Sequence, residues 1–200
     1  KLLTLGDMAA ALAHELKNPL VSIGGFAQRL KKKLPQDSPA LLYAEQIITE
    51  TARLEETVDG AVRFVKESAM RVRLEDVNEI LDDAVKLFED DLAVRNIAVV
   101  KDFYRGPLTI AADREQLKIA FDNLIANALQ SMPGGGTLRL ATVKSGEWAV
   151  AEVTDSGGGI DPKNIGYIFN PFFTTKTNGT GLGLPITNSI VMRHKGVIEV

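Results

Sequence analysis

The chain has 200 residues, 45% of them hydrophobic and 24% charged, which is ordinary for a globular protein and enough for one large domain or two modest ones. The net charge of −3 argues against duplex nucleic acid as the main ligand, because such proteins carry a strongly basic surface. The lack of cysteine excludes disulfides, thiolate metal sites and cysteine nucleophiles. No apolar run approaches the length of a membrane span. We interpret the chain as an excised piece of a longer protein, so any membrane contact is expected only through segments upstream of it.

Two amphipathic helices are expected in the first third of the chain. Apolar residues recur every three or four positions over residues 5–34, and a second such stripe covers residues 44–65. Pro19 is expected to kink the first helix, and the proline-containing segment 34–39 to reverse the chain. Two copies of this antiparallel hairpin, packed as a four-helix bundle, would bury both stripes, which predicts a homodimer. The alternative is that the hairpin packs on the rest of its own chain.

The remaining two thirds of the chain mixes helices and strands. The helical pattern breaks at residues 66–74, which predicts a hinge there and a boundary between a domain of residues 1–68 and one of residues 69–200, the second incomplete at its C-terminal end. The later elements are expected as helices after the capping residues Asp76 and Asp113, strands at 97–103, 137–144 and 147–154, and a last helix at 183–193. The predicted fold class is α+β: an N-terminal antiparallel helical hairpin, then an α/β sandwich with a mixed, largely antiparallel sheet.

His14 is the first candidate for chemistry. It lies off the apolar stripe and shares a helix face with Asn18, so its side chain should face solvent. An imidazole can attack phosphorus through one ring nitrogen while a carboxylate, here Glu15, orients or accepts the proton on the other. On composition alone an ordinary surface histidine is the commoner case. We interpret His194, the other histidine, as a helix-capping or surface residue.

Two segments of the second domain could contact a nucleotide, although no P-loop is present. Asn123 and Asn127 are four residues apart, so their carboxamides share one helix face and could bind a hard cation balanced by ATP phosphates. Ordinary surface asparagines are the alternative. Asp155 opens the sequence DSGGGI after a predicted strand, where its carboxylate could accept a hydrogen bond from an exocyclic amine and the glycines would admit a flat ring. A plain glycine turn is the alternative there.

A third glycine cluster, GTGLGL at residues 179–184, is expected to open the last helix. Free backbone N–H groups and the helix dipole favour phosphate at such a position. Lys176 precedes the cluster and could meet a phosphate as well. The phenylalanines within residues 168–173 could anchor a loop over the nucleotide, although singly they are more readily core residues.

Five motifs, taken in order, resemble those of sensor histidine kinases. They are an H box (HELKNPL, 14–20), an N box (NLIANA, 123–128), and G1, F and G2 boxes at 155–160, 169–173 and 179–184. The resemblance implies a dimerisation and histidine-phosphotransfer hairpin followed by an ATP-binding domain of the type shared with gyrase, Hsp90 and MutL. It also implies a protein-histidine kinase of a two-component system, which uses ATP and Mg²⁺ to phosphorylate its own His14 and passes the phosphoryl group to an Asp of a response-regulator receiver domain.

The resemblance carries residue roles with it. His14 would be the phosphoacceptor, Glu15 its acid–base partner, and Asn18 would orient water in a phosphatase reaction on the phosphorylated partner. Asn123 and Asn127 would hold Mg²⁺, whereas Asp155 would recognise adenine. The residues expected to contact the nucleotide or shape its pocket and lid are Asn123, Asn127, Asp155, Gly157, Gly159, Lys176, Thr180, Gly181, Leu182 and Gly183.

The sequence lacks the features that two other functions would need, and it departs from the family pattern at two places. A gyrase-type ATP hydrolase would need a Glu four residues before the metal-binding Asn, where this chain has Asn123. A degenerate, non-enzymatic dimeric scaffold would need a lost motif, and none is lost in this sequence. Gln130 stands where many relatives carry Lys, and the stretch from Phe173 to Gly179 is short for a lid. The expected location is the cytoplasm, with any membrane anchor upstream.

Overall fold

The computed structural model describes residues 5–65, 70–176 and 179–200, with side chains described from residue 13 to 62 within the first of these ranges. The chain divides into two compact units, residues 1–68 with 171–182 and residues 69–170 with 183–200. The predicted domain boundary after residue 68, and the first part of the predicted hinge, lie outside the described residues. No described helix is both long and apolar enough to cross a bilayer.

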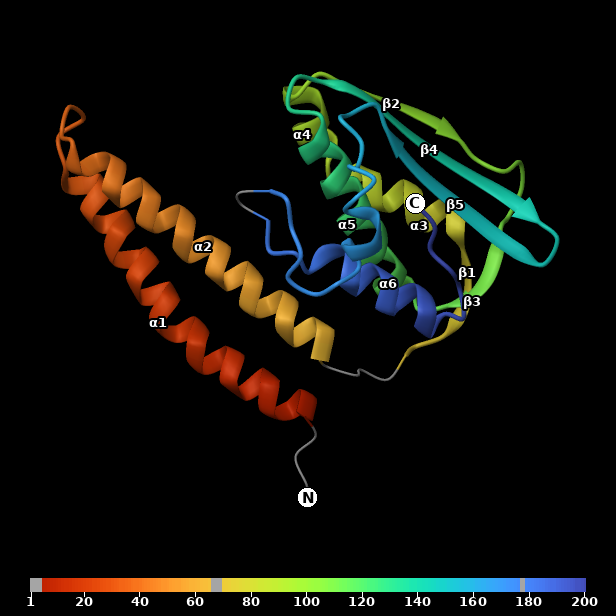
Figure 1. The fold of residues 1–200 in the computed structure, drawn as a ribbon, viewed down its shortest axis with the longest axis horizontal. Coiled ribbons are helices and arrows are strands. Elements are labelled where there is room, and N and C mark those ends of the chain that lie inside the picture. The colour runs from red at the N-terminus through yellow and green to blue at the C-terminus, as the bar shows by residue number, and fades with distance from the viewer. Residues whose placement is uncertain (1–4, 66–69, 177–178) are drawn as a thin grey trace. The chain divides into compact units, whose positions relative to one another are not determined.

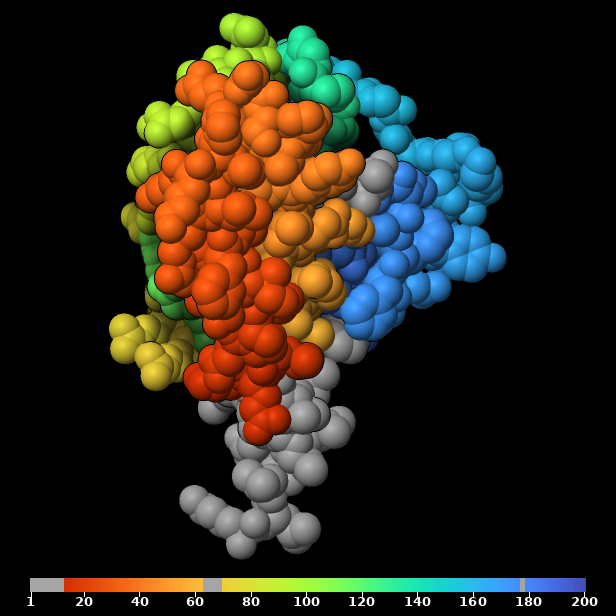
Figure 2. All heavy atoms as spheres, turned by 90° about the vertical axis from the view of Figure 1, so that its left-hand side faces the viewer, coloured from red at the N-terminus to blue at the C-terminus, as the bar shows by residue number. Residues whose placement is uncertain are grey.

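The first unit contains the expected helical hairpin, formed by α1 (Leu5–Lys33) and α2 (Ala40–Val65). Small residues face its inner seam, where Ala27, Ala44 and Thr51 are buried. A Cβ added at Gly24 would lie 3.0 Å from Thr51 Oγ1, so the two helices approach closely there. Figure 1 shows the two helices antiparallel, and Figure 2 shows them packed side by side.

Large apolar side chains of the hairpin lie on its outside. Leu16, Ile23 and Leu30 recur at seven-residue intervals on α1 and are 56%, 48% and 48% exposed. Ile47 and Leu54 repeat the same spacing on α2 and are 42% and 48% exposed. A seven-residue apolar repeat is the pattern of a helix seam that packs against further helices. The inner seam therefore uses the small residues, and a second apolar seam is left in contact with solvent.

The second unit is an α/β sandwich with a mixed sheet, as predicted. Strand β4 (Gly136–Ser145) pairs in parallel with β2 (Ile97–Asp102) and antiparallel with β5 (Trp148–Asp155). A separate small sheet pairs β1 (Arg73–Asp76) with β3 (Thr109–Ala112). The helices are α3 (Val77–Lys86), α4 (Glu89–Val94), α5 (Arg114–Ser131) and α6 (Gly183–Arg193), with a 3₁₀ turn at Ile165–Tyr167.

The core of the second unit lies between the larger sheet and the helices. Figure 1 shows α3, α5 and α6 on one face of that sheet. Ile80 and Leu81 of α3, Ile125 of α5, and Leu138 and Leu140 of β4 have no exposed surface. On β4 these two buried residues alternate, and on α3 the buried residues Val77, Ile80, Leu81 and Ala84 recur every three or four positions, as the burial of one face of each element requires. This core fixes α5 against the sheet, and α5 carries the two candidate asparagines.

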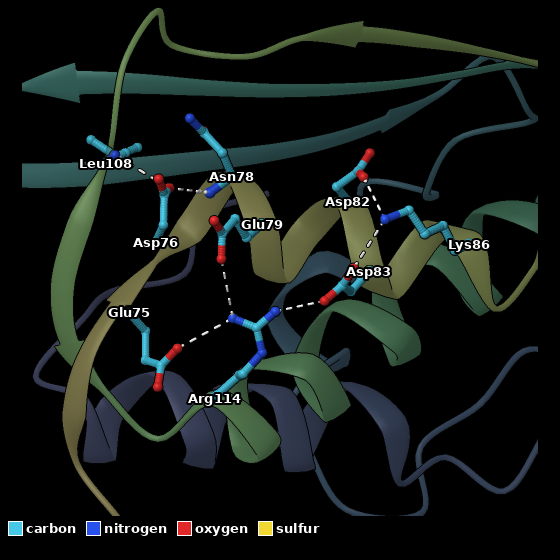
Figure 3. Close-up of polar contacts among 9 residues, drawn as sticks. All are labelled: Glu75, Asp76, Asn78, Glu79, Asp82, Asp83, Lys86, Leu108 and Arg114. Carbon is cyan, nitrogen blue, oxygen red and sulfur yellow. Dashed lines mark hydrogen bonds and ion pairs between the residues drawn. The ribbon is translucent and has the colours of Figure 1, made fainter.

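An ion-pair network joins β1, α3 and the first residue of α5 (Figure 3). The Arg114 guanidinium contacts the carboxylates of Glu75 at 3.2 Å, Asp83 at 2.6 Å and Glu79 at 3.8 Å. Hydrogen bonds from Lys86 and then Arg114 hold the pKa of Asp83 below its usual value. A cation shared by several carboxylates restricts motion more than an isolated surface pair does. The start of α5 is therefore tied to α3 as well as packed on it.

Asp113 is the N-cap of α5 that the sequence predicted, and it makes further contacts. Its Oδ1 accepts the Gln116 N–H at 3.2 Å, and its Oδ2 accepts the Arg71 N–H at 2.8 Å. Its own N–H donates to His194 Nε2 at 2.9 Å. His194 Nδ1 lies 2.8 Å from the Ile190 carbonyl oxygen, so the ring proton is on Nδ1. The capping interpretation of His194 is confirmed, and the same ring also links α6 to α5.

The carboxylate of Asp113 is expected to make stability depend on pH in the acid range. Burial raises its pKa, but the hydrogen bonds from Arg71 and Gln116 outweigh burial, and the pKa lies below the ordinary value of 3.8. A lowered folded-state pKa stabilises the fold above the unfolded-state pKa, and this stabilisation is lost as pH falls through the folded value. Between about pH 5 and pH 3 the free energy of unfolding should therefore fall more steeply for the wild type than for Asp113→Asn.

Urea unfolding followed by tryptophan fluorescence measures this slope, because the single tryptophan, Trp148, lies in the second unit. Asn can still accept the capping hydrogen bond, so the variant should fold and differ chiefly in its pH dependence. If the free energy of unfolding fell equally steeply with pH in both proteins, the lowered pKa of Asp113 would be contradicted.

The predicted helices and long strands are confirmed with small shifts of their ends, whereas the shortest elements were not predicted. The strands expected at 137–144 and 147–154 are found at Gly136–Ser145 and Trp148–Asp155. The unpredicted elements are β1, β3, α4 and the 3₁₀ turn.

Candidate functional site

The three candidate residues of the first helix share an exposed surface of α1. His14, Glu15 and Asn18 are all exposed, and the exposure predicted for His14 from its position off the apolar stripe is confirmed. Asn18 Nδ2 lies 3.5 Å from His14 Nδ1, which is at the outer limit of a hydrogen bond. The imidazole is therefore open to solvent and held only weakly by its neighbour one turn away. It is accessible to a reacting group from outside the hairpin.

The two candidate asparagines project from α5 in the second unit, and both are half-buried. Asn123 Nδ2 donates to the Gly183 carbonyl oxygen at 3.3 Å and lies 3.5 Å from Thr187 Oγ1. Thr187 is fully buried and donates to the same carbonyl. With the amide nitrogen of Asn123 turned to the start of α6, its Oδ1 is the atom left for an outside ligand. Asn127 lies one turn further along the same helix.

A cation at this position would depend on neutral oxygens and on phosphate. Among the residues that the structure describes, no cluster of three or more histidine or acidic side chains could hold a metal ion. Carboxamide oxygens suit a hard ion such as Mg²⁺ when a substrate supplies the negative charge. The donor set around Asn123 therefore fits a metal bound together with a polyphosphate, and fits a protein-only metal site poorly.

Asp155 is held at the end of β5 by two donors to one of its oxygens. Its Oδ1 lies 2.7 Å from the Ser131 hydroxyl and accepts the Gly157 N–H at 2.8 Å. None of the described residues bonds Oδ2. Ser131 is the last residue of α5, so the carboxylate is anchored to the helix that carries the asparagines. An ionised carboxylate oxygen without a partner is an acceptor for an N–H of a ligand.

The glycines after Asp155 are required by geometry at two positions. A Cβ at Gly157 would lie 2.6 Å from the Ser131 carbonyl oxygen and 2.7 Å from Asp155 Oδ1, closer than real Cβ contacts. Gly159 has φ of +69°, in the left-handed region that favours glycine. A Cβ at Gly158 meets nothing within 4 Å. The backbone of this segment therefore packs directly against α5 and Asp155, without a side chain between them.

The candidate residues at 176 and 180–182 belong to a loop in the first unit. The Phe172 N–H donates to the Gly181 carbonyl oxygen at 2.9 Å, and both residues have φ of +67°. A Cβ on Gly181 would lie 2.7 Å from Phe172 Cα, so the two ends of the loop are in direct backbone contact. A left-handed phenylalanine is a strained conformation of the kind found at functional loops.

Within this loop the predicted residues differ in exposure. Lys176 is exposed, and its N–H donates to Thr174 Oγ1 at 3.1 Å. Thr180 Oγ1 accepts the Leu182 N–H at 3.4 Å, and the Leu182 side chain is 1% exposed. Gly183 begins α6 in the second unit.

The second unit thus carries, on α5, the end of β5 and the start of α6, the candidates Asn123, Asn127, Asp155, Gly157, Gly159 and Gly183. The His14 group and the 171–182 loop belong to the first unit. Sequence reasoning missed Ser131 and Thr187, which orient Asp155 and Asn123. The position of Ser131 at the end of the asparagine-bearing helix was the only available signal for it.

Two family models match the chain. Residues 4–69 match the His Kinase A (phospho-acceptor) domain, and residues 112–200 match the histidine kinase-, DNA gyrase B-, and HSP90-like ATPase. Sporulation kinase C of Bacillus subtilis (strain 168) is 34% identical over 201 residues, which covers 100% of this chain and 46% of that protein. Sensor histidine kinase ZraS of Escherichia coli (strain K12) is 34% identical over 200 residues, covering 100% of this chain and 43% of that protein. The chain spans less than half the length of these relatives.

Solved structures agree with the family models. Histidine kinase ThkA in complex with the response regulator TrrA has a TM-score of 0.71 at 31% identity, covering 96% of this chain and 56% of that chain. The isolated catalytic domain of ThkA has a TM-score of 0.58 at 31% identity, covering 62% of this chain and 82% of that chain. Full-length ShkA in complex with AMPPNP, at 22% identity and a TM-score of 0.73, supports the fold alone. With a phosphoacceptor hairpin and an ATPase-type domain in one chain, this protein belongs to the sensor histidine kinase family.

Proposed function

We propose that this chain is the catalytic core of a two-component sensor kinase, which phosphorylates its own His14 with ATP and passes the phosphoryl group to an aspartate of a receiver domain. The observation that carries the proposal is the exposed imidazole of His14, beside Glu15 and Asn18, within the segment that matches phosphoacceptor domains. An exposed ring, whose hydrogen bond to Asn18 is long at 3.5 Å, can be approached by both a phosphoryl donor and a phosphoryl acceptor.

The nucleotide is proposed to bind through groups with separate tasks. Asp155 Oδ2 would accept a hydrogen bond from the exocyclic amine of adenine. The Oδ1 atoms of Asn123 and Asn127 would be ligands for Mg²⁺, which supplies charge neutralisation for the phosphates. Lys176, Thr180, Gly181, Leu182 and Gly183 would contact phosphates through one ammonium group and several backbone N–H groups.

In the transfer step, one ring nitrogen of His14 attacks the γ-phosphorus of ATP, the substrate. An N–P bond forms, the bond from phosphorus to the bridging oxygen breaks, and ADP leaves with the electron pair. The proton on the other ring nitrogen passes to the Glu15 carboxylate, which keeps the attacking nitrogen basic. In the second transfer, a carboxylate of the receiver domain attacks the phosphorus and the N–P bond breaks. Asn18 would orient the water that hydrolyses the resulting acyl phosphate.

The hairpin is proposed to form a homodimer. Leu16, Ile23, Leu30, Ile47 and Leu54 form an exposed apolar seam with a seven-residue repeat on both helices. A second copy of the hairpin would cover this seam as a four-helix bundle, which removes apolar surface from water. The location proposed for this core is the cytoplasm, where ATP and receiver domains are available.

A labelling experiment tests the proposed function. The protein is incubated with γ-labelled ATP and Mg²⁺, and the label is tested for acid lability and alkali stability before peptide mapping. A phosphohistidine at His14 is the expected result, because the phosphoramidate bond is cleaved by acid and survives alkali. An acid-stable label on a hydroxyl group would sink the proposal, and so would release of phosphate without any labelled protein. The second result would favour an ATP hydrolase, for which no water-activating Glu stands at position 123.

A further inference from the structure

Ser131 occupies a position that links two parts of the nucleotide site. It is the last residue of α5, four positions after Asn127, and its side chain is half-buried. Its Oγ lies 2.7 Å from Asp155 Oδ1 and 2.7 Å from the Ala128 carbonyl oxygen. A hydroxyl has one proton to donate, and both neighbours are acceptors. The charged carboxylate is the stronger acceptor, so it takes the larger share of that proton.

The two donors on Asp155 act on the same oxygen. The Ser131 hydroxyl and the Gly157 N–H both reach Oδ1, at 2.7 and 2.8 Å. Two donors from different segments, one on a helix and one in a loop, fix both the rotation of the carboxylate and the direction in which Oδ2 points. With Oδ1 saturated, Oδ2 is the atom presented to a ligand, because no described residue bonds it.

The orientation of the Asp155 carboxylate determines which bases it can bind. A carboxylate oxygen such as Asp155 Oδ2 can only accept hydrogen bonds. It attracts an amine on the base, and it repels a carbonyl oxygen at the same place. Adenine has an amine at its C6 position, whereas hypoxanthine and guanine have a carbonyl oxygen there. A carboxylate free to rotate could turn away from a carbonyl oxygen and bind other bases through water. A fixed carboxylate cannot do so, and it discriminates between these bases.

We propose that Ser131 is a positioning residue that sets selectivity for adenine by holding Asp155 Oδ1, so that Oδ2 alone faces the base. The inference rests on the proposed function, since it assumes that Asp155 recognises adenine. Gly157 supplies the second donor, but its backbone N–H is present with any residue at that position. Of the two donors to Asp155 Oδ1, only the Ser131 hydroxyl therefore depends on the identity of a side chain.

The test compares ATP with inosine triphosphate, which differs from ATP in having a carbonyl oxygen at C6. Dissociation constants for both are measured by titration calorimetry with Mg²⁺ on the wild type, Ser131→Ala, Asp155→Ala and Ser145→Ala. Ser131→Ala should weaken ATP binding about five-fold, because Asp155 loses one of the two hydrogen bonds that orient it toward the amine. Binding of inosine triphosphate should be no weaker than in the wild type, because the freed carboxylate can turn away from its carbonyl oxygen. Ser145→Ala removes the same atom from the exposed end of β4 and should match the wild type.

The outcomes separate this inference from the proposed function. If Asp155→Ala removes the preference for ATP while Ser131→Ala keeps it, the inference on Ser131 is overturned and the adenine assignment stands. If Asp155→Ala keeps the preference, both fail. An equal loss of affinity for the two nucleotides in Ser131→Ala would show a general structural role and would also overturn the inference. Retained binding of inosine triphosphate demonstrates that the variant is folded.

Discussion

Replacing His14 by glutamine is expected to abolish acid-labile phosphorylation of the protein while leaving ATP affinity unchanged. Glutamine has a similar length but no nucleophilic ring nitrogen, so no N–P bond can form. The side chain is exposed, and its one hydrogen bond to a described side chain is long, at 3.5 Å, so its replacement removes little from the fold. The expected loss of labelling is more than about a thousand-fold, because a missing nucleophile has no substitute.

The chain contains one other histidine, which provides a matched control. His194 accepts the Asp113 N–H at 2.9 Å, so His194→Gln should lower stability and still acquire label in the folded fraction. Labelling is measured per mole of protein, and ATP affinity is measured separately by calorimetry. Acid-labile label that persists in His14→Gln and disappears in His194→Gln would reverse the assignment of the phosphoacceptor.

Gly157→Ala is expected to weaken ATP binding roughly 30- to 150-fold, which corresponds to about 2–3 kcal/mol. The new methyl group would lie 2.6 Å from the Ser131 carbonyl oxygen and 2.7 Å from Asp155 Oδ1. The Ser131 carbonyl oxygen belongs to the backbone and cannot turn aside, whereas Asp155 Oδ1 ends a side chain, so the loop has to move, the carboxylate has to turn, or both. Either movement spoils the orientation of Asp155 and the close approach of the backbone to a base.

Gly158→Ala is the control for this substitution, because its Cβ meets nothing within 4 Å. It changes the same atoms in the adjacent residue, and its ATP affinity should stay within about two-fold of the wild type. Calorimetric titration with ATP measures both variants, and thermal unfolding shows whether either one loses its fold. Equal affinities for the two variants would mean that the close packing at residue 157 plays no part in binding.

The longest helices were predictable because the periodicity of their apolar residues, or a capping residue at the N-terminus, marked them in the sequence. The apolar stripes fixed α1 and α2, and Asp113 marked the start of α5 through its side-chain hydrogen bond to Gln116 N–H. The short strands β1 and β3 have four residues each, too few for an alternating pattern to be distinguished from a loop. Helix α4 has six residues, and Phe88 at its N-cap makes no side-chain capping bond.

The candidate site was predicted by residue type more than by arrangement. Asn123, Asn127 and Asp155 drew attention because amides and carboxylates at those spacings suit a metal and an amine. Their supports could not be found in the same way. Ser131 and Asp155 are 24 residues apart, and Asn123 and Thr187 are 64 apart, so these contacts exist only once the chain has folded. Residues that orient a functional group through tertiary contacts leave no local pattern in a sequence.

The contact between Arg71 and Asp113 has a mechanical consequence. Arg71 follows closely on the segment that leaves α2, and its amide is bonded to the N-cap of α5. From Asp113 to Asn123 the backbone is one uninterrupted α-helix about 15 Å long. A packed helix of that length moves as a rigid rod. The backbone amide of residue 71 is therefore held at one end of this rod, and the carboxamide of Asn123 lies about two to three turns along it, with no intervening loop between them.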